Sequence, residues 1–274
     1  MYSTNEKHEK LLSFIVPVYN CERFLEPCLE SIVAQDFPDA EILLIDDGST
    51  DSSPKICQAF AQRDNRIRYI RKENTGVAHT RNLGISLAKG KYIMFSDSDD
   101  TLEGDSFTSF VNAMENSDCG IAISSFFRCE ATTKRPTLVA NELDGIVALK
   151  EYARQLIKSP ADYYFGVVWN KCYIADIIKN NKIFFNNRFP WGEDFEFNMQ
   201  YLHHVEKAAL LKEPHYNYYK RAGSLSGIKA SLKKPLKIKH GLFPSYKSLI
   251  EKLGLFEKHR LRTYMFYIAI AKDR

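Results

Sequence analysis

Three carboxylates follow an apolar run in the stretch Tyr92-Ile93-Met94-Phe95-Ser96-Asp97-Ser98-Asp99-Asp100. The apolar run is typical of a buried strand. Side chains two apart on an extended segment share a face, so Asp97 and Asp99 are expected to point the same way. Adjacent carboxylates repel each other unless a cation lies between them, and Mg²⁺ and Mn²⁺ prefer oxygen ligands, including phosphate. The stretch predicts a metal–phosphate site at a strand end, although Asp residues also cap helices, here one near Gly104.

Strand and helix patterns alternate along the residues that precede this stretch. Apolar runs predict strands at 12–18, 41–45, 67–70 and 92–95, and apolar residues at helical spacing predict helices at 24–33, 53–61 and 77–88. This alternation predicts an α/β fold, with a Rossmann-like, mostly parallel sheet and helices on both faces. Tyr19, Asp46, Asp97 and Asp99 follow strand ends and should gather at one rim. The first strand precedes no G-x-G-x-x-G, so a dinucleotide site is not expected.

The amino-acid composition favours a globular protein over a membrane-spanning or disulfide-linked one. The 274 residues are 45% hydrophobic and 26% charged, which suits one large core with or without an appendage. The six cysteines have no C-x-x-C spacing and predict reduced thiols in a cytoplasmic protein. No apolar run reaches the roughly 18 residues of a membrane helix, and the polar stretch 1–10 predicts no signal peptide. The net charge of +4 does not indicate nucleic-acid binding.

The pattern is looser after residue 118. Residues 119–124 predict another strand, 128–141 a variable loop, and the segment from 229 onward amphipathic helices. No acidic residue lies between Glu213 and Glu251, whereas eight lysines and arginines do. This basic C-terminal region is either a solvated helical surface or a surface that faces phosphate or an anionic membrane.

Five strings, in this order, resemble the family 2 inverting glycosyltransferases with the GT-A fold, of the bacterial surface-polysaccharide type. They are FIVPVYN (14–20), IDDGSTD (45–51), AHTRNLG (78–84), FSDSDD (95–100) and WGEDFEF (191–197). The resemblance covers roughly residues 11 to 226, but His79-Thr80 replaces small residues and 128–164 has no match. It implies a GT-A domain at 1–225, with a nucleotide-binding half at about 11–100 and an acceptor half at about 101–225. Residues 226–274 would be a basic helical extension.

On the donor side, the resemblance implies that Asp99 ligates the metal and that Asp97 contacts the ribose or metal waters. Pro17 and Tyr19 would flank the base, and Tyr19 could equally be packed. Asp46 would accept the N3–H of uracil; its alternative is an Asx-turn, which suits Asp47 better. Arg81 would lie near the nucleotide or diphosphate, although an exposed helical arginine looks the same.

On the acceptor side, Glu193-Asp194 matches the family's E-D motif, and Asp194 is implied to be the base. Glu193 would lie about 100° away around a helix, so it cannot serve the same proton. Both acids would also suit a helix N-terminus. Trp169, near Lys171 in the family's W-x-K string, is expected to stack on a sugar or to lie in the core. Further residues match a lid that closes on the diphosphate, among them Arg221 and Ser224.

The resemblance implies an inverting hexosyl- or N-acetylhexosaminyltransferase that depends on Mn²⁺ or Mg²⁺. Its donor would be a nucleotide-sugar, most simply a UDP-sugar, and its acceptor a hydroxyl of a glycan or lipid-linked acceptor. The basic C-terminal region would contact the inner face of the cell membrane or form a homodimer. One alternative is a phosphatase-like hydrolase, because 97–101 resembles a D-x-D-x-T loop. The other is a silent module that binds nucleotide or glycan.

Overall fold

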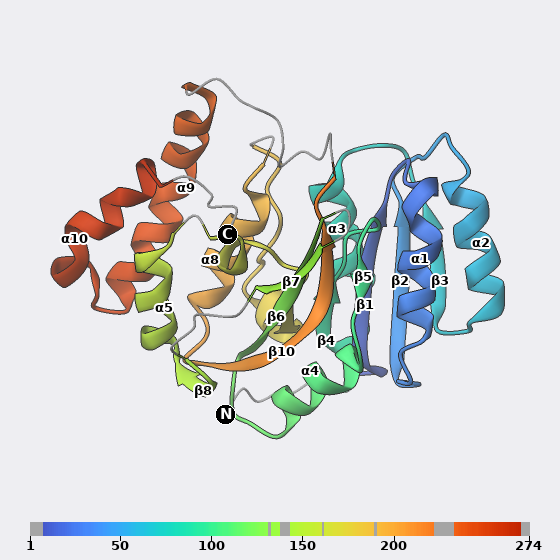
Figure 1. The fold of residues 1–274 in the computed structure, drawn as a ribbon, viewed down its shortest axis with the longest axis horizontal. Helices are drawn as coiled ribbons and strands as arrows, with labels where there is room; N and C mark the ends of the chain where they lie inside the picture. The colour runs from blue at the N-terminus through green and yellow to red at the C-terminus, as the bar shows by residue number, and fades with distance from the viewer. Residues whose placement is uncertain are drawn as a thin grey trace.

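The computed structural model describes residues 8–130, 133–137, 143–160, 162–188, 191–221 and 233–269. Its first half forms the right-hand part of Figure 1 and alternates strand and helix, as the sequence predicts. The elements are β1 (Lys10–Val18), α1 (Glu22–Val33), β2 (Ala40–Asp46), α2 (Ser53–Arg63), β3 (Ile67–Arg71), α3 (Val77–Leu87) and β4 (Gly90–Phe95). Every strand and helix predicted before residue 100 is present.

The four strands of this half are parallel and lie in the order β3-β2-β1-β4. After β3 the chain crosses back over β2 and β1 to reach β4. Because such crossovers are right-handed, the reversal places α1 and α2 on one face of the sheet and α3 on the other. In Figure 1, α1 lies in front of the sheet and α3 behind it. Ligands of sheets with this topology bind beside the strand ends where the order reverses, here between β1 and β4.

The sheet continues into the second half through β9, β6, β10 and β5. The strand β9 runs antiparallel to both β4 and β6, whereas β6 and β10 are parallel. The α/β fold with helices is therefore confirmed, and the sheet as a whole is mixed.

The elements of this half are β5 (Thr101–Leu102), α4 (Ser106–Glu115), β6 (Ile121–Glu130), β7 (Thr133–Thr137), β8 (Gly145–Ala148), α5 (Leu149–Lys158), α6 (Tyr163–Gly166), β9 (Lys171–Ile174), α7 (Ala175–Asn180), α8 (Glu193–Leu202) and β10 (Lys207–Tyr219).

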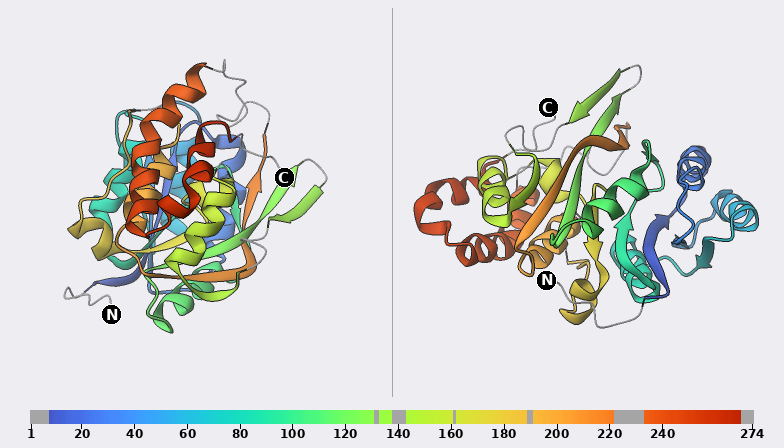
Figure 2. Two further views of the ribbon diagram at one scale, coloured as in Figure 1. Left: turned by 90° about the vertical axis from the view of Figure 1, so that its left-hand side faces the viewer. Right: turned by 90° about the horizontal axis from the view of Figure 1, so that it is seen from below.

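The prediction of a loop at 128–141 is wrong for its first part. The strand β6 extends to Glu130 and pairs antiparallel with β7, and the two form the projecting ribbon in Figure 2. This pairing is not evident from the sequence, because the strand β7 is charged and exposed and contains Pro136. Proline is tolerated in a strand only at a sheet edge or a bulge, and β7 pairs with β6 alone, at the edge of the sheet.

The C-terminal helices share the core of the molecule. They are α9 (Lys233–Lys252) and α10 (Phe256–Tyr264), followed by the 3₁₀ turn η2 (Met265–Tyr267), and they confirm the helical C-terminal region. On α8, the ring of Phe195 lies 6.2 Å from Tyr246 of α9 and 5.5 Å from Phe266. In Figures 1 and 2 these helices lie at the end of the molecule opposite α2. Within the described ranges, no helix has the length and apolar character that a membrane span requires.

One glycine permits the close approach of α9 to α8. Gly192 precedes α8 with φ +96°, in the left-handed region that favours glycine. A Cβ atom at this position would lie 2.7 Å from Cδ1 of Leu242 on α9. The glycine therefore lets α9 pack directly against the N-terminus of α8, where the predicted base is located.

Candidate active site

Arg81 lies at the centre of the candidate site. It is on α3, is 4% exposed, and its guanidinium lies over the ring of Phe185 at 5.3 Å. One terminal nitrogen donates to Oδ1 of Asp194 at 2.6 Å, and the other donates to Oδ1 of Asp97 at 2.9 Å. Glu193 is a more distant partner at 3.5 Å. A buried guanidinium requires such partners, and this one joins the end of β4 to the N-terminus of α8.

The loop that carries Asp97 and Asp99 is held from the side of β10. The backbone N–H of Asp97 donates to the hydroxyl of Tyr216, and that hydroxyl donates to Asp100 Oδ2 at 3.0 Å. The backbone N–H of Tyr219 donates to the other oxygen of Asp100 at 2.8 Å. Asp100 therefore fixes the loop to β10 instead of capping a helix. This leaves the side chains of Asp97 and Asp99 partly exposed, at 34% and 41%.

The donor set of this loop fits a hard divalent cation. Burial raises the pKa of Asp99, the charge of Asp97 raises it further, and Arg221 opposes both. A divalent cation would relieve this repulsion between two carboxylates. Among the residues that the structure describes, no three His, Cys, Asp or Glu side chains converge as a complete metal cage. Asp97 and Asp99 would therefore hold Mg²⁺ or Mn²⁺ together with oxygens of a substrate or of water.

Arg221 follows β10 and contacts the same loop. Its guanidinium donates to Oδ2 of Asp99 at 2.7 Å and lies 3.6 Å from Oδ1 of Asp100. This contact brings a predicted lid residue to the predicted metal ligand. Ser224, the other predicted lid residue, lies outside the described residues. Tyr216, whose hydroxyl holds the loop, is not among the residues predicted for the site, and the tyrosine-rich end of β10 is a sequence signal for it. Tyr219 belongs to the predicted lid segment and holds the loop through its backbone N–H.

Asp194, the residue predicted to act as the base, has a raised pKa. Its side chain lies in the first turn of α8 and is 21% exposed. Burial raises its pKa to about 7, the charges of Glu193 and Asp97 act in the same direction, and Arg81 and Lys171 oppose them. A carboxyl group with a pKa near neutrality can take a proton from a hydroxyl more readily than an ordinary aspartate. Glu193 is also near Arg81, so both residues of the E-D pair lie in the site.

The nucleotide half of the site differs from the prediction at Asp46. Tyr19 is 51% exposed, directly after the end of β1, whereas Pro17 is buried within that strand. Asp46 is fully buried, with its oxygens accepting hydrogen bonds from the Ser49 N–H at 2.8 Å and the Tyr69 hydroxyl at 2.9 Å. Its carboxylate thus holds the loop after β2 and, as placed, does not face a base.

Asp47 has a related structural role. Burial raises its pKa, but Lys72 and the backbone N–H groups of Thr75 and Gly76 outweigh burial and lower it overall. Both N–H groups donate to its carboxylate, at 2.9 and 2.8 Å. Because these groups directly precede α3, Asp47 fixes the start of the helix that carries Arg81.

Two residues predicted for the acceptor side are buried. Trp169 is 4% exposed and stacks on Tyr216 at 4.3 Å, so it supports β10 and offers no face to a sugar. Lys171 is fully buried, and its ammonium donates to the carbonyls of Tyr164 and Val167 at 2.9 and 2.6 Å. Burial lowers the pKa of Lys171 to about 7. Lys171 therefore anchors the segment before β9 and does not contact an acceptor.

This arrangement can be compared with known proteins. The model described as glycosyl transferase family 2 matches residues 13–181. The uncharacterized glycosyltransferase EpsJ of Bacillus subtilis is 32% identical over 220 residues, which cover 80% of this chain and 63% of EpsJ. The teichoic acid poly(glycerol phosphate) polymerase of Staphylococcus epidermidis is 34% identical over 202 residues, covering 72% of this chain and 26% of the polymerase. The chain thus spans less than two thirds of either relative.

The structure of S. aureus TarS 1-349 in complex with UDP-GlcNAc superposes with a TM-score of 0.75 at 20% identity, covering 95% of this chain and 76% of the TarS 1-349 chain. At this identity the similarity concerns the fold, and it confirms the expected GT-A architecture. The family match includes the rim of β1 and β4 and the whole of α3, which carries Arg81. Because this match spans more than half of the chain, it shows that the chain belongs to glycosyl transferase family 2.

Proposed function

We propose that the protein is a metal-dependent, inverting glycosyltransferase that moves a sugar from a UDP-sugar to a hydroxyl group. The acceptor would be a glycan or lipid-linked acceptor in bacterial surface polysaccharide synthesis. One observation carries this proposal: a single guanidinium, that of Arg81, contacts both the donor-side Asp97 and the candidate base Asp194. The complex of TarS with UDP-GlcNAc and the teichoic acid polymerase are consistent with this donor and this class of product.

In the proposed mechanism, the residues of the two sides act on opposite faces of the sugar. Asp99 and Asp97 would hold a divalent cation, which supplies positive charge to the departing diphosphate. Asp194 takes the proton of the acceptor hydroxyl, whose oxygen attacks the anomeric carbon opposite the leaving nucleotide. Arg81 orients Asp194 and keeps it paired until the hydroxyl arrives. Inversion follows because the attack occurs in one displacement.

Nucleotide binding tests the donor side of this proposal. Calorimetry with UDP, GDP and CDP, each with Mn²⁺ and with EDTA, is expected to show binding of UDP only and only with metal. Asp99→Asn is expected to remove the metal dependence together with most of the affinity, because it halves the carboxylate donor set. Tight binding of GDP or CDP would contradict the uridine assignment. Phosphate release from simple monoesters, without any nucleotide binding, would favour the hydrolase.

The pKa of Asp194 predicts the pH dependence of the reaction. The base is active when ionised, so kcat/KM is expected to rise with pH through about 7 and then level off. Glu193→Gln removes a negative charge that raises this pKa, so the midpoint should move to lower pH. The measurement is the pH profile of kcat/KM for both proteins. A profile that is flat between pH 5 and 9 would contradict the assignment of Asp194.

We also propose that the basic helical extension at 226–274, through its last helix α10 and the turn η2, contacts an anionic membrane at the cytoplasmic face. Leu261, Tyr264, Met265 and Ile268 are 86%, 42%, 52% and 68% exposed, and their spacing gives an apolar stripe on one side of α10 and η2. The basic residues Lys258, Arg260 and Arg262 lie in the same helix as this stripe. An exposed apolar stripe beside cations fits an anionic lipid surface.

Vesicle sedimentation tests this membrane contact. The protein is expected to sediment with vesicles that contain phosphatidylglycerol, and less with purely zwitterionic vesicles. Leu261→Ser with Ile268→Ser should abolish the binding, whereas Ile146→Ser, a change at a 56% exposed position on β8, should not. If the double variant instead dissociates a dimer and leaves vesicle binding unchanged, the stripe is a subunit interface.

A further inference from the structure

Arg221 is enclosed by two aromatic rings that the proposed mechanism does not use. The carbon atom Cζ of its guanidinium lies 4.1 Å from the ring centroid of Phe24, on α1, and 5.1 Å from that of Tyr219, on β10. Both rings are partly exposed, at 38% and 37%. Aromatic faces attract a guanidinium, so two rings from different elements fix its position. We refer to Phe24, Tyr219 and Arg221 as the arginine clamp.

The arginine clamp places its charge on the predicted metal ligand. Arg221 donates to Oδ2 of Asp99 at 2.7 Å and also to the backbone carbonyl of Asp99. Meanwhile Asp97 accepts from Arg81. Each of the two carboxylates that would hold a cation is therefore paired with an arginine. The two pairs differ, because Arg81 is 4% exposed and shared with Asp194, whereas the side chain of Arg221 is 21% exposed.

We propose that Arg221 is an internal counter-cation of Asp99 and that it has to leave Asp99 before a divalent cation binds there. Phe24 and Tyr219 are then positioning residues, which set how often Asp99 is occupied by the guanidinium. This proposal rests on the proposed function, since it takes Asp99 as the metal ligand. In addition, the arginine clamp would keep the Asp99 carboxylate paired, and so unavailable to a metal ion, until the nucleotide arrives.

The consequence is a coupling between metal and nucleotide. A site that is open for only a fraction of the time binds its ligand more weakly by that fraction. A diphosphate offers the displaced guanidinium a new partner, since arginine binds phosphate oxygens through a planar fork of donors. The metal alone should therefore bind weakly, and the metal with UDP should bind tightly. Removing the clamp should have opposite effects on these two affinities.

The test measures Mn²⁺ affinity by electron paramagnetic resonance of free Mn²⁺, without nucleotide. Arg221→Gln is expected to bind Mn²⁺ about tenfold more tightly, because both the pairing and the positive charge are lost. Phe24→Leu and Tyr219→Leu, which change no charge, should each tighten binding about threefold. With UDP present, Arg221→Gln is expected to weaken UDP–Mn²⁺ binding about tenfold.

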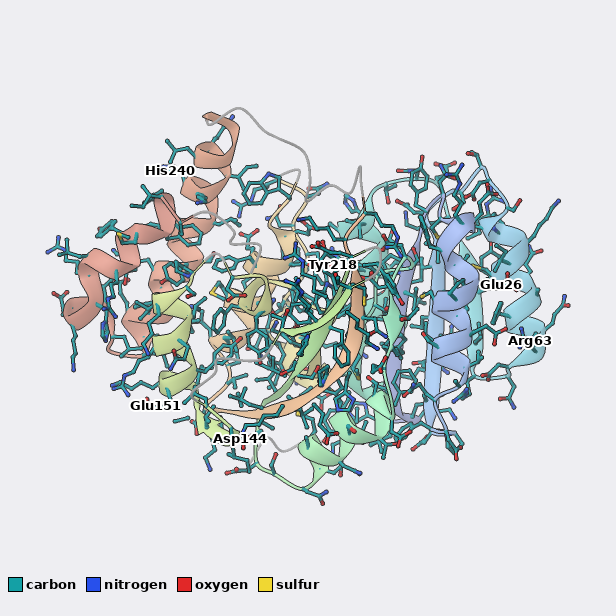
Figure 3. All side chains as sticks on the ribbon, in the orientation of Figure 1. Glu26, Arg63, Asp144, Glu151, Tyr218 and His240 are labelled. Atoms are coloured by element: carbon teal, nitrogen blue, oxygen red, sulfur yellow. The ribbon has the colours of Figure 1, made fainter. Side chains whose placement is uncertain are left out.

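A matched arginine serves as the control. Arg63, on α2, also lies over an aromatic ring, that of Phe60 at 4.6 Å, and also pairs with a carboxylate, that of Glu30. Figure 3 shows Arg63 at the outer edge of α2, whereas Tyr218, near the end of β10, lies in the middle of the molecule. Arg63→Gln should leave the Mn²⁺ affinity unchanged.

The double variant Phe24→Leu with Arg221→Gln separates the clamp from a general charge effect. If Phe24 acts through Arg221, its substitution adds nothing once Arg221 is replaced. The clamp is refuted if Phe24→Leu and Tyr219→Leu leave Mn²⁺ affinity unchanged, or if the effects of Phe24→Leu and Arg221→Gln simply add. Failure of the proposed function looks different: Asp99→Asn would then leave Mn²⁺ binding intact, or no variant and no wild-type protein would bind Mn²⁺ at all.

Discussion

Replacing Asp194 by asparagine is expected to lower kcat by about 10²- to 10⁴-fold, the range that a positioned general base contributes. Asparagine has nearly the shape of aspartate, and its amide oxygen can still accept from Arg81, which donates to Asp194 at 2.6 Å. The geometry of the site should persist while the group that takes the proton is lost. The measurement is sugar transfer at saturating donor and acceptor, beside the calorimetric affinity for UDP with Mn²⁺, which should change little.

The neighbouring acid provides the control for this prediction. Glu193 lies 3.5 Å from Arg81, in the same turn of α8. Glu193→Gln should reduce kcat much less than Asp194→Asn, since Glu193 only modifies the charge around the base. A larger loss for Glu193→Gln than for Asp194→Asn would exchange the roles of the two residues. Full activity of Asp194→Asn would show that neither the base nor the mechanism is as proposed.

Replacing Arg81 by methionine is expected to affect both activity and stability. The change leaves Asp97, Glu193 and Asp194 facing one another without the guanidinium that joins them. Removing one partner of a buried ion pair costs about 3–5 kcal/mol, and the lower end is expected because the carboxylates keep some contact with solvent. The free energy of unfolding from urea denaturation should thus fall by about 3 kcal/mol, and transfer activity should be lost.

The pH dependence of the loss of stability in Arg81→Met distinguishes repulsion between the carboxylates from a loss of side-chain packing. Protonation of the carboxyl groups removes their repulsion, so Arg81→Met should be less destabilising at pH 5 than at pH 8. Arg81→Lys keeps one charge but loses the fork that reaches both Asp97 and Asp194, so it should restore stability more than activity. Arg63→Gln, at a half-exposed ion pair, should change the free energy of unfolding much less than Arg81→Met does. A deficit for Arg81→Met that is equal at both pH values would indicate packing alone.

The sequence predicts the first half of the fold because its information is local. Apolar runs and helical spacing depend on neighbours along the chain, and they locate β1 to β4 with their helices. The same reasoning places Asp97 and Asp99 at one rim, because parallel strands end on the same side of a sheet. The E-D motif and Arg81 came from the family resemblance, and the structure joins them through one guanidinium.

The sequence does not predict which polar side chains point away from the rim. Asp46 and Asp99 both follow strands, yet Asp46 is fully buried beneath Ser49 and Tyr69, because the next loop and β3 cover it. Trp169 and Lys171 are buried by β10 and by the segment before β9. Each of these outcomes depends on contacts between segments distant in the chain, and periodicity carries no information about them.

The packing of α9 at Gly192 has a consequence for exchange of parts between family members. The helix that carries Asp194 rests on Leu242 and Tyr246, which belong to α9 and not to the matched region 13–181. In a hybrid enzyme whose α9 comes from another family member, the residues that pack against the helix carrying Asp194 would therefore differ from the native ones. Hybrids joined between β10 and α9 should regain turnover when the residues facing Gly192 and Phe195 are transplanted together with the acceptor half. The acceptor half and the C-terminal helices would then have to be exchanged together for the hybrid to acquire a new range of acceptors.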